Sequence, residues 1–293
     1  MDTARQLASL LEPIVGQVYF SPECHAEYEA LGFAPSPGKA GDVALPDGPA
    51  YFTSRGSLMG QVPGDVVAAA FSVFNPAVVN PMVAIGWTRT DAATICAART
   101  RGATAQLVRI LGVHPKGIER ARELLMATAA PLRPEGRPLF AGALAHGYPG
   151  DAVGDVWHAG DLLREYRGDC HTAAWITAGL TAPEIGLLTE AYWGLKPRTY
   201  IRTRAWSDAD LDTAQAHLAD RGWLDAGGLT PDGRAAREDI ELVTDRQMQP
   251  AIDALGANAN ELFTIIEPWG VAVRAAGGYL ASGPHDLARL ANR

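Results

Sequence analysis

The chain has 293 residues, of which 47% are hydrophobic and 20% are charged, so it is long enough for two packed domains and is not mainly disordered. Its formal net charge of −8 disfavours a general polyanion binder, although a local basic patch can coexist with an acidic total. Three cysteines and no secretion signal favour a reducing compartment, so we expect a cytoplasmic protein.

The first half of the sequence predicts a series of helices. Its opening residues carry leucine, isoleucine and valine at helical spacing, and Ser21 followed by a proline has the form of a helix start. The longest apolar region, residues 62–87, is interrupted by prolines, so it predicts short buried helices and no membrane span. The expected elements are helices at 3–20 and 22–32, a surface loop at 34–50, short helices within 62–87, and helices near 91–111 and 115–130.

Residues 206–246 carry the clearest local pattern in the chain, that of a winged helix. Ser207 is placed as the N-cap of an acidic, amphipathic helix, which Gly222 ends. A glycine pair at 227–228 suits the tight turn of a wing, and Thr230 before a proline starts the next helix. These signals predict a helix, a turn, a small β-wing and a second helix, in that order.

A weak internal repeat relates the two halves of the chain. Residues 97–115 align with residues 164–183; each copy has an Arg-Gly step and a turn glycine, and another helix is expected after each. We therefore predict a mainly α fold of two related helical lobes, the C-terminal one a winged helix with a small β-wing. The predicted lobes are residues 1–135, a degenerate winged-helix-like unit, and residues 136–293.

A dense polar set lies within residues 157–175, next to a core-like helical face. Where the first repeat copy has Gly-Ala-Thr-Ala, the second has Gly168-Asp169-Cys170-His171, so the scaffold does not itself require those polar groups. A histidine near an aspartate can act as an acid or base near neutral pH, and paired arginines suit a carboxylate or phosphate. We predict His171 as a catalytic base, Asp169 as the group that orients it, and Arg164, Arg167 and His158 as ligand-binding residues. The alternative is a buried salt-bridge network that pins the lobes together.

Several residues of the first half are candidates for the opposite wall of a pocket between the lobes. A histidine and a tyrosine lie three apart on one helix face, an arginine precedes a glycine-rich turn, and an asparagine lies next to a proline. The candidate ligand-binding residues are His25, Tyr28, Arg55, Asn75 and Trp87. Each also has a purely structural interpretation: an exposed helix histidine, an arginine in an ion pair, an asparagine that caps a turn, or an aromatic residue of the core.

The sequence carries no metal or nucleotide signature. Cys24-His25 and Cys170-His171 are adjacent pairs and lack the spacing with which one short element chelates zinc, so no metal site is predicted. No dinucleotide fingerprint and no nucleophile elbow occurs. A haem needs only one axial histidine, which has no local signature, so haem stays open as a cofactor with His25, His158 or His171 as its ligand.

Residues 218–241, LADRGWLDAGGLTPDGRAAREDIE, resemble the wing and following helix of MarR regulators. The whole chain is similar to an actinobacterial family of helix-turn-helix proteins with the features YF-x2-R, VP-x-x-VVAA-x-F and LRE-x-RGD-x-H, which stand here at residues 51–55, 62–71 and 163–171. The MarR resemblance implies a homodimer, a small-molecule pocket and DNA binding. Neither resemblance implies a particular reaction.

Three functions fit these observations. We favour a small-molecule-binding protein, which as an enzyme would use acid-base chemistry on an acidic or aromatic metabolite in the pocket between the lobes. A second function is a ligand-responsive, MarR-like regulator of transcription, but five aspartates at 208–225 against one arginine have the wrong sign for DNA phosphates. The third is an interaction scaffold that uses the winged helix as its dimer surface. The second function, the regulator, is supported by one basic cluster near the winged helix that could contact DNA phosphates: Lys196, Arg198, Arg202 and Arg204.

Overall fold

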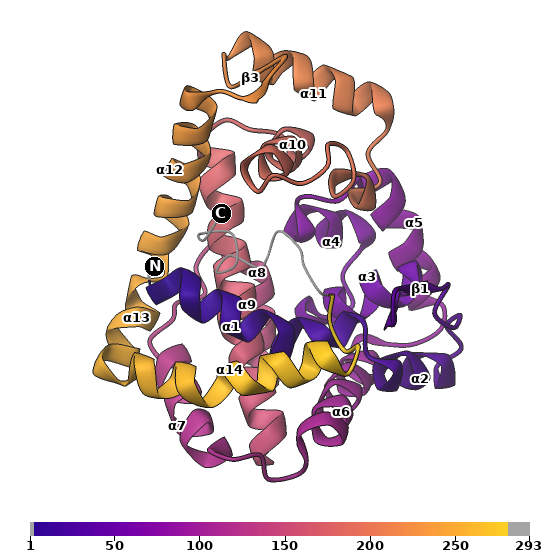
Figure 1. The fold of residues 1–293 in the computed structure, drawn as a ribbon. Helices are drawn as coiled ribbons and strands as arrows, with labels where there is room; N and C mark the ends of the chain where they lie inside the picture. The colour runs from indigo at the N-terminus through magenta and orange to yellow at the C-terminus, as the bar shows by residue number, and fades with distance from the viewer. Residues whose placement is uncertain (1–2, 281–293) are drawn as a thin grey trace.

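The computed structural model describes residues 3–280 and is mainly helical, as the sequence predicts (Figure 1). The first half contains α1 (Thr3–Gly16), η1 (Gln17–Tyr19), α2 (Pro22–Ala30), β1 (Lys39–Ala40), β2 (Val43–Ala44), α3 (Gly48–Gly56), η2 (Ser57–Met59), α4 (Gly64–Phe71), α5 (Pro76–Trp87), α6 (Ala92–Leu111), α7 (Ile118–Ala129) and α8 (Pro138–His146). The second half contains α9 (Ala152–Thr177), α10 (Ala182–Tyr192), η3 (Ile201–Arg204), α11 (Asp208–Asp220), β3 (Leu224–Asp225), β4 (Gly228–Leu229), α12 (Pro231–Gln247), α13 (Gln249–Leu255), η4 (Gly256–Asn258) and α14 (Ala259–Ala275). None of these helices is long and apolar enough to cross a membrane.

The N-terminal elements follow the predicted pattern with two local differences. The first helix ends at Gly16 and continues as the 3-10 turn η1, where a single helix was expected. The apolar region at 62–87 forms the short helices α4 and α5, which Pro63 and Pro76 start as predicted, whereas Pro81 lies within α5 and does not divide it. The expected surface loop at 34–50 contains a small antiparallel hairpin, in which Ala40 pairs with Val43.

The long helix α9 is the central element of the molecule. It runs through the middle of the fold (Figure 1), and α1, α6, α7, α8 and α12 all pack against it. Asp151 caps its first turn by accepting a hydrogen bond from the Gly154 N–H. Because α9 is surrounded by other helices, its charged residues Asp161 and Glu165 are fully buried.

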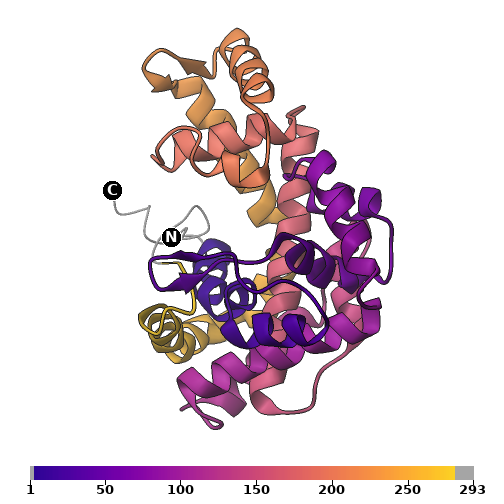
Figure 2. The same ribbon diagram turned by 90° about the vertical axis from the view of Figure 1, so that its right-hand side faces the viewer.

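The segment predicted as a winged helix lies at one end of the molecule, where α10 to α12 have a small core of their own (Figure 2). We refer to α10 to α12 below as the winged helix. Ser207 caps α11, and Thr230 caps α12, as expected from the sequence. The wing is a two-stranded antiparallel hairpin in which Leu224 pairs with Leu229. Its core is formed by Ala174, Trp175, Leu180, Ile185, Leu187, Leu188, Ile201, Leu211, Ala214, Leu218 and Ile240.

Helices from both predicted lobes share the largest hydrophobic core. After the winged helix, α13 and α14 return to pack against α1, α6 and α7. α6 and α9 each end near a glycine with positive φ, Gly112 or Gly179, before the next helix begins. The relation between the two predicted repeat copies and the division at residue 135 stay predictions.

Two glycines of α9 provide a matched test of how closely its neighbours approach it. A Cβ on Gly160 would lie 2.6 Å from Val15 Cγ2, whereas a Cβ on Gly168 would meet no atom within 4 Å. We expect Gly168→Ala to raise the free energy of unfolding by roughly 0.5–1 kcal/mol, because alanine is the better helix former. Gly160→Ala should lower it by about 1–3 kcal/mol through overpacking. Urea denaturation measures both values, and effects of the same sign would contradict this description of α9.

Candidate functional site

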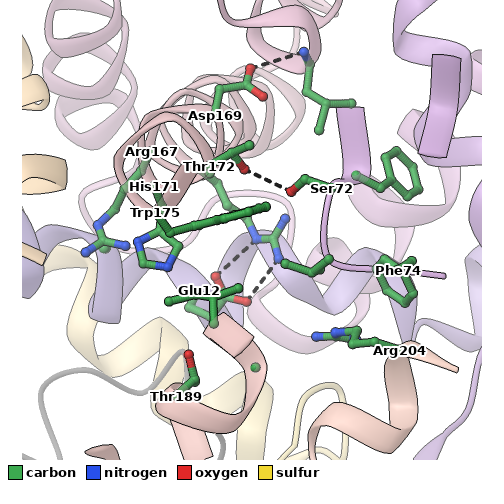
Figure 3. A pocket seen from close by; sticks show the side chains of 18 of the residues that line it. Glu12, Ser72, Phe74, Arg167, Asp169, His171, Thr172, Trp175, Thr189 and Arg204 are labelled. Atoms are coloured by element: carbon green, nitrogen blue, oxygen red, sulfur yellow. Dashed lines mark hydrogen bonds and ion pairs between the residues drawn. The ribbon is translucent and has the colours of Figure 1, made fainter. Parts of the chain in front are cut away.

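A cavity of about 220 Å³ lies between the winged helix and the rest of the molecule (Figure 3). Residues of α1, α3, α4 and α9 form one side, and residues of α10, η3 and α12 form the other. Apolar side chains, five arginines and three carboxylates make up its wall. The charged and aromatic wall residues are Glu12, Tyr51, Arg55, Phe71, Phe74, Arg164, Arg167, Asp169, His171, Trp175, Trp193, Tyr200, Arg204, Arg237 and Glu241.

Two of the arginines are held by carboxylates on the body side of the cavity. Arg55 donates from Nε and Nη2 to the two carboxylate oxygens of Glu165, at 3.0 and 2.7 Å. Arg164 donates from Nε to Glu12 Oε2 at 3.0 Å and from Nη1 to Glu165 Oε1 at 3.2 Å. Burial raises the pKa of Glu165, but the charges of Arg55 and Arg164 outweigh it and lower this pKa to about 2.

Arg167 and His171 face α12 on the other side of the cavity. Arg167 Nη2 donates to Glu241 Oε2 at 2.8 Å, and Arg237 Nη1 lies 2.8 Å from the second oxygen of the same carboxylate. His171 Nδ1 lies 3.2 Å from Thr244 Oγ1 and 3.9 Å from Glu241 Oε1. Burial raises the pKa of Glu241, but Arg237 and Arg167 lower it well below its usual range. These contacts form a buried salt-bridge network of the kind given above as the alternative to a ligand site.

Asp169 is directed away from His171, unlike the predicted pairing. Its Oδ2 accepts hydrogen bonds from the Leu139 and Phe140 N–H groups, at 3.1 and 3.0 Å, where α8 begins. Figure 3 shows Asp169 and His171 on different sides of α9. Helix geometry explains the difference, because residues two apart on an α-helix do not share a face. Burial raises the pKa of Asp169 to about 7, although the two N–H groups lower it.

Arg204 reaches the cavity from η3, on the winged-helix side. Its guanidinium carbon lies 4.6 Å from the centroid of the Phe74 ring and 4.5 Å from that of Tyr200. Its Nη2 donates to the Tyr200 hydroxyl at 2.8 Å, while its buried Nε has no hydrogen-bond partner. Over residues 3–280 no carboxylate lies within ion-pair distance of Arg204, which distinguishes it from the four other arginines of the wall.

The structure brings together five of the predicted site residues and leaves five outside the cavity. The cavity wall includes Arg55, Arg164, Arg167, Asp169 and His171, whereas His25, Tyr28, His158, Asn75 and Trp87 lie elsewhere. His25 is buried rather than exposed, and its Nε2 lies 3.2 Å from the Tyr19 carbonyl oxygen. The His158 ring is buried against Tyr148. Asn75 caps α5, which is the structural role considered for it.

Several cavity residues were not predicted from the sequence. Glu12, Phe74 and Trp175 line the cavity, and none of them was a candidate site residue. On α12, Arg237 and Glu241 are four residues apart and so share a helix face, and this spacing is the one signal that could have indicated a charged wall.

Histidine, cysteine, aspartate and glutamate side chains do not gather into a group of three that could hold a metal, within the described part of the chain. The three cysteines are buried and unbridged. Of the histidines considered as haem ligands, His25 lies on α2, whereas His158 and His171 lie on α9, with His171 alone in the cavity wall.

A comparison with protein families identifies the architecture. Residues 4–280 match a helix-turn-helix family, which covers nearly the whole chain. The chain belongs to this helix-turn-helix family. The whole-chain resemblance inferred from the sequence is therefore confirmed at the level of a helix-turn-helix protein. Searches among curated proteins and among solved structures find no match.

In this helix-turn-helix protein, two arginines of the basic cluster pair with aspartates of α11. Arg198 Nη2 donates to Asp212 Oδ1 at 2.7 Å, and Arg202 pairs with Asp208, both aspartates being on α11. Arg204 is turned into the cavity. Asp208 and Asp212 of α11 therefore already pair with the arginines beside them, which is unfavourable for a DNA phosphate surface.

Glu165→Gln tests whether the ion pairs beside the cavity hold the fold. Removing one partner leaves Arg55 with a buried, unpaired charge, so we expect the free energy of unfolding to fall by about 3–5 kcal/mol at neutral pH. The folded pKa of about 2 lies below the ordinary value of 4.5, so the stabilisation by Glu165 is complete above pH 4.5 and is lost as the pH falls toward 2.

Urea denaturation at several pH values measures both effects. The wild type should lose stability as the pH falls through this range, and the variant should lose less. Glu119→Gln is the matched control, because Glu119 is 71% exposed in its surface pair with Arg122 and should matter little. If Glu165→Gln and Glu119→Gln lowered the free energy of unfolding by similar amounts, the buried ion pair would contribute no more to stability than the surface pair.

Proposed function

We propose that this protein binds a small molecule in the cavity between its helical body and its winged helix, and that the bound molecule fixes the position of the winged helix. The observation that carries the proposal is the makeup of the cavity wall, which includes residues of α1, α3, α4 and α9 and also residues of α10, η3 and α12. A ligand there contacts both parts of the molecule, so its binding free energy favours the arrangement in which both are in place.

Hydrogen bonds beside the cavity support this coupling. The Asn75 N–H donates to the Arg204 carbonyl oxygen at 2.9 Å, and Trp206 Nε1 donates to the Val73 carbonyl oxygen at 2.8 Å. The loop at residues 72–75 therefore joins the body to the chain segment immediately before α11. A change in the cavity wall at this point would be transmitted first to α11.

Binding is better supported than catalysis. His171 lines the cavity, but the aspartate expected to orient it, Asp169, accepts hydrogen bonds from the start of α8. Thr244 and Glu241 lie beside His171 Nδ1 instead. These contacts fix the imidazole ring, and a fixed ring serves a hydrogen bond to a ligand without any reaction.

A side chain that fills the cavity tests the proposal. Thr172 lines the cavity and the neighbouring Ala173 is exposed on α9, so Thr172→Trp and Ala173→Trp form a matched pair. We expect native mass spectrometry of the purified wild type to show a bound metabolite, which Thr172→Trp loses and Ala173→Trp keeps. Hydrogen exchange should be faster in α11 and in the wing of Thr172→Trp, because the ligand no longer bridges the two sides. Unchanged exchange and an unchanged mass in Thr172→Trp would refute ligand coupling.

A ligand-responsive DNA-binding regulator is the second candidate, because the chain belongs to a helix-turn-helix family. The charges of α11 oppose it, since Arg198 and Arg202 already pair with Asp212 and Asp208. Because these arginines are already neutralised, the surface would release few counterions from DNA and would gain little binding affinity from them.

DNA binding is tested by fluorescence anisotropy on labelled genomic fragments at two salt concentrations. We expect no salt-sensitive binding by the wild type, whereas a regulator with 6–10 phosphate contacts would lose roughly 10³–10⁵ in affinity between about 50 and 200 mM salt. The double variant Asp208→Asn, Asp212→Asn frees both arginines and should gain weak, salt-sensitive affinity. Tight wild-type binding that Arg198→Gln abolishes would establish the regulator instead.

A further inference from the structure

We infer that the ligand of this cavity is an apolar monocarboxylate whose carboxylate group pairs with Arg204. The inference rests on the proposed function, and it names the chemical class that the cavity accepts. It depends on the charge of Arg204, on the donors without acceptors in the wall, and on the apolar surface between them.

The charges around the cavity balance except at Arg204. Four of the five arginines in the cavity wall have a carboxylate partner in the structure: Arg55 has Glu165, Arg164 has Glu12, Arg237 has Glu241, and Arg167 has Glu241 and also Asp245. Arg204 has none among the described residues, and the aromatic rings of Phe74 and Tyr200 hold it in place. A guanidinium that remains charged at neutral pH in a partly buried position is stabilised by an anion. One uncompensated charge calls for one negative charge on the ligand.

The surroundings of Arg204 suit a carboxylate. Its guanidinium carbon lies over the Phe74 and Tyr200 rings, and its Nη2 donates to the Tyr200 hydroxyl, while its buried Nε has no acceptor. The planar fork of an arginine matches the two oxygens of a carboxylate. Figure 3 shows Arg204 and Phe74 together at one side of the cavity.

Several buried hydrogen-bond donors of the cavity wall lack an acceptor. Trp175 is 5% exposed and lines the cavity, and its Nε1 has no hydrogen-bond partner. Arg204 Nε and Arg167 Nε, from two further residues of the wall, are also buried without an acceptor. Buried donors of this kind cost free energy unless an acceptor is supplied. A ligand with oxygen atoms supplies acceptors for these donors, and a carboxylate supplies two oxygens that share a negative charge.

The remaining wall defines the rest of the ligand. Leu7, Leu11, Phe71, Val73 and Ile185 contribute apolar surface to the cavity. A phosphate monoester carries a charge of about −1.5 to −2 at neutral pH and would place the excess charge against Glu12 and Glu241. A carboxylic acid with an aromatic ring or an alkyl chain instead matches both the single free cation of the described wall and the apolar surface.

The test uses a panel of probes with the full-length protein. Benzoate, 2-naphthoate, hexanoate and octanoate are each compared with the corresponding primary amide by isothermal titration calorimetry, because the amide keeps the shape and removes the charge. We expect at least one carboxylate to bind roughly ten- to a hundredfold more tightly than its amide, as a charge-assisted hydrogen bond implies.

Arg204→Gln should remove this preference for the carboxylate, and Arg204→Lys should keep part of it. Arg202→Gln is the matched control, because Arg202 lies in the same turn η3, is exposed, and pairs with Asp208 outside the cavity wall. The preference should survive in that variant. Circular dichroism of Arg204→Lys and Arg204→Gln shows whether each remains folded.

Three results would overturn the inference: amides that bind as tightly as their carboxylates, a preference that survives in Arg204→Gln, or a wild type that binds no member of the panel. Failure of the inference is distinguishable from failure of the proposed function. A neutral or cationic metabolite that co-purifies with the wild type and is lost in Thr172→Trp would keep the cavity as a ligand site and reject the carboxylate. The absence of any ligand effect in Thr172→Trp would reject both.

Discussion

The ion pairs of α9 hold its neighbours in place, and the rest of the structure is arranged around them. A buried charge without a partner costs several kcal/mol, so each pair fixes the register of one neighbouring helix against α9. A slide by one helical turn, about 5.4 Å, would break the pair. The pairs join Asp161 to Arg99 of α6, Glu165 to Arg55 of α3, Arg164 to Glu12 of α1, and Arg167 to Glu241 of α12.

The cavity lies where three hydrophobic cores meet. Leu11 belongs to the main core, Phe71 and Phe74 to the core of α3, α4 and α5, and Trp175 to the core of the winged helix, yet all four line the cavity. The side chains of each core pack against one another, so a space remains where the three cores meet. The ion pairs of α9 form the polar part of the wall of this space. A ligand site at this junction therefore follows from the way the cores divide.

The sequence predicted what local chemistry determines. Ser207 and Thr230 indicated the winged helix because an N-cap acts within three residues of itself. The partners of α9 could not be predicted in this way, since Arg164 lies 152 residues from Glu12. Half of the predicted site residues line the cavity, because they share α9 or face it. Arg204 was grouped with Arg198 and Arg202 by proximity in sequence, but the turn η3 directs it to the other side.

The contacts around the cavity indicate how a ligand acts on the winged helix. On one side, Asn75 and Trp206 make three neutral hydrogen bonds across the junction, and such bonds contribute about 0.5–1.5 kcal/mol each. On the other side, α12 packs along α9, and Glu241 of α12 pairs with Arg167 of α9. We take the side joined by a few hydrogen bonds as the weaker one, so the winged helix should pivot about the contact between α9 and α12. Arg204 lies on the weaker side, where a ligand of modest differential affinity is enough to shift the balance.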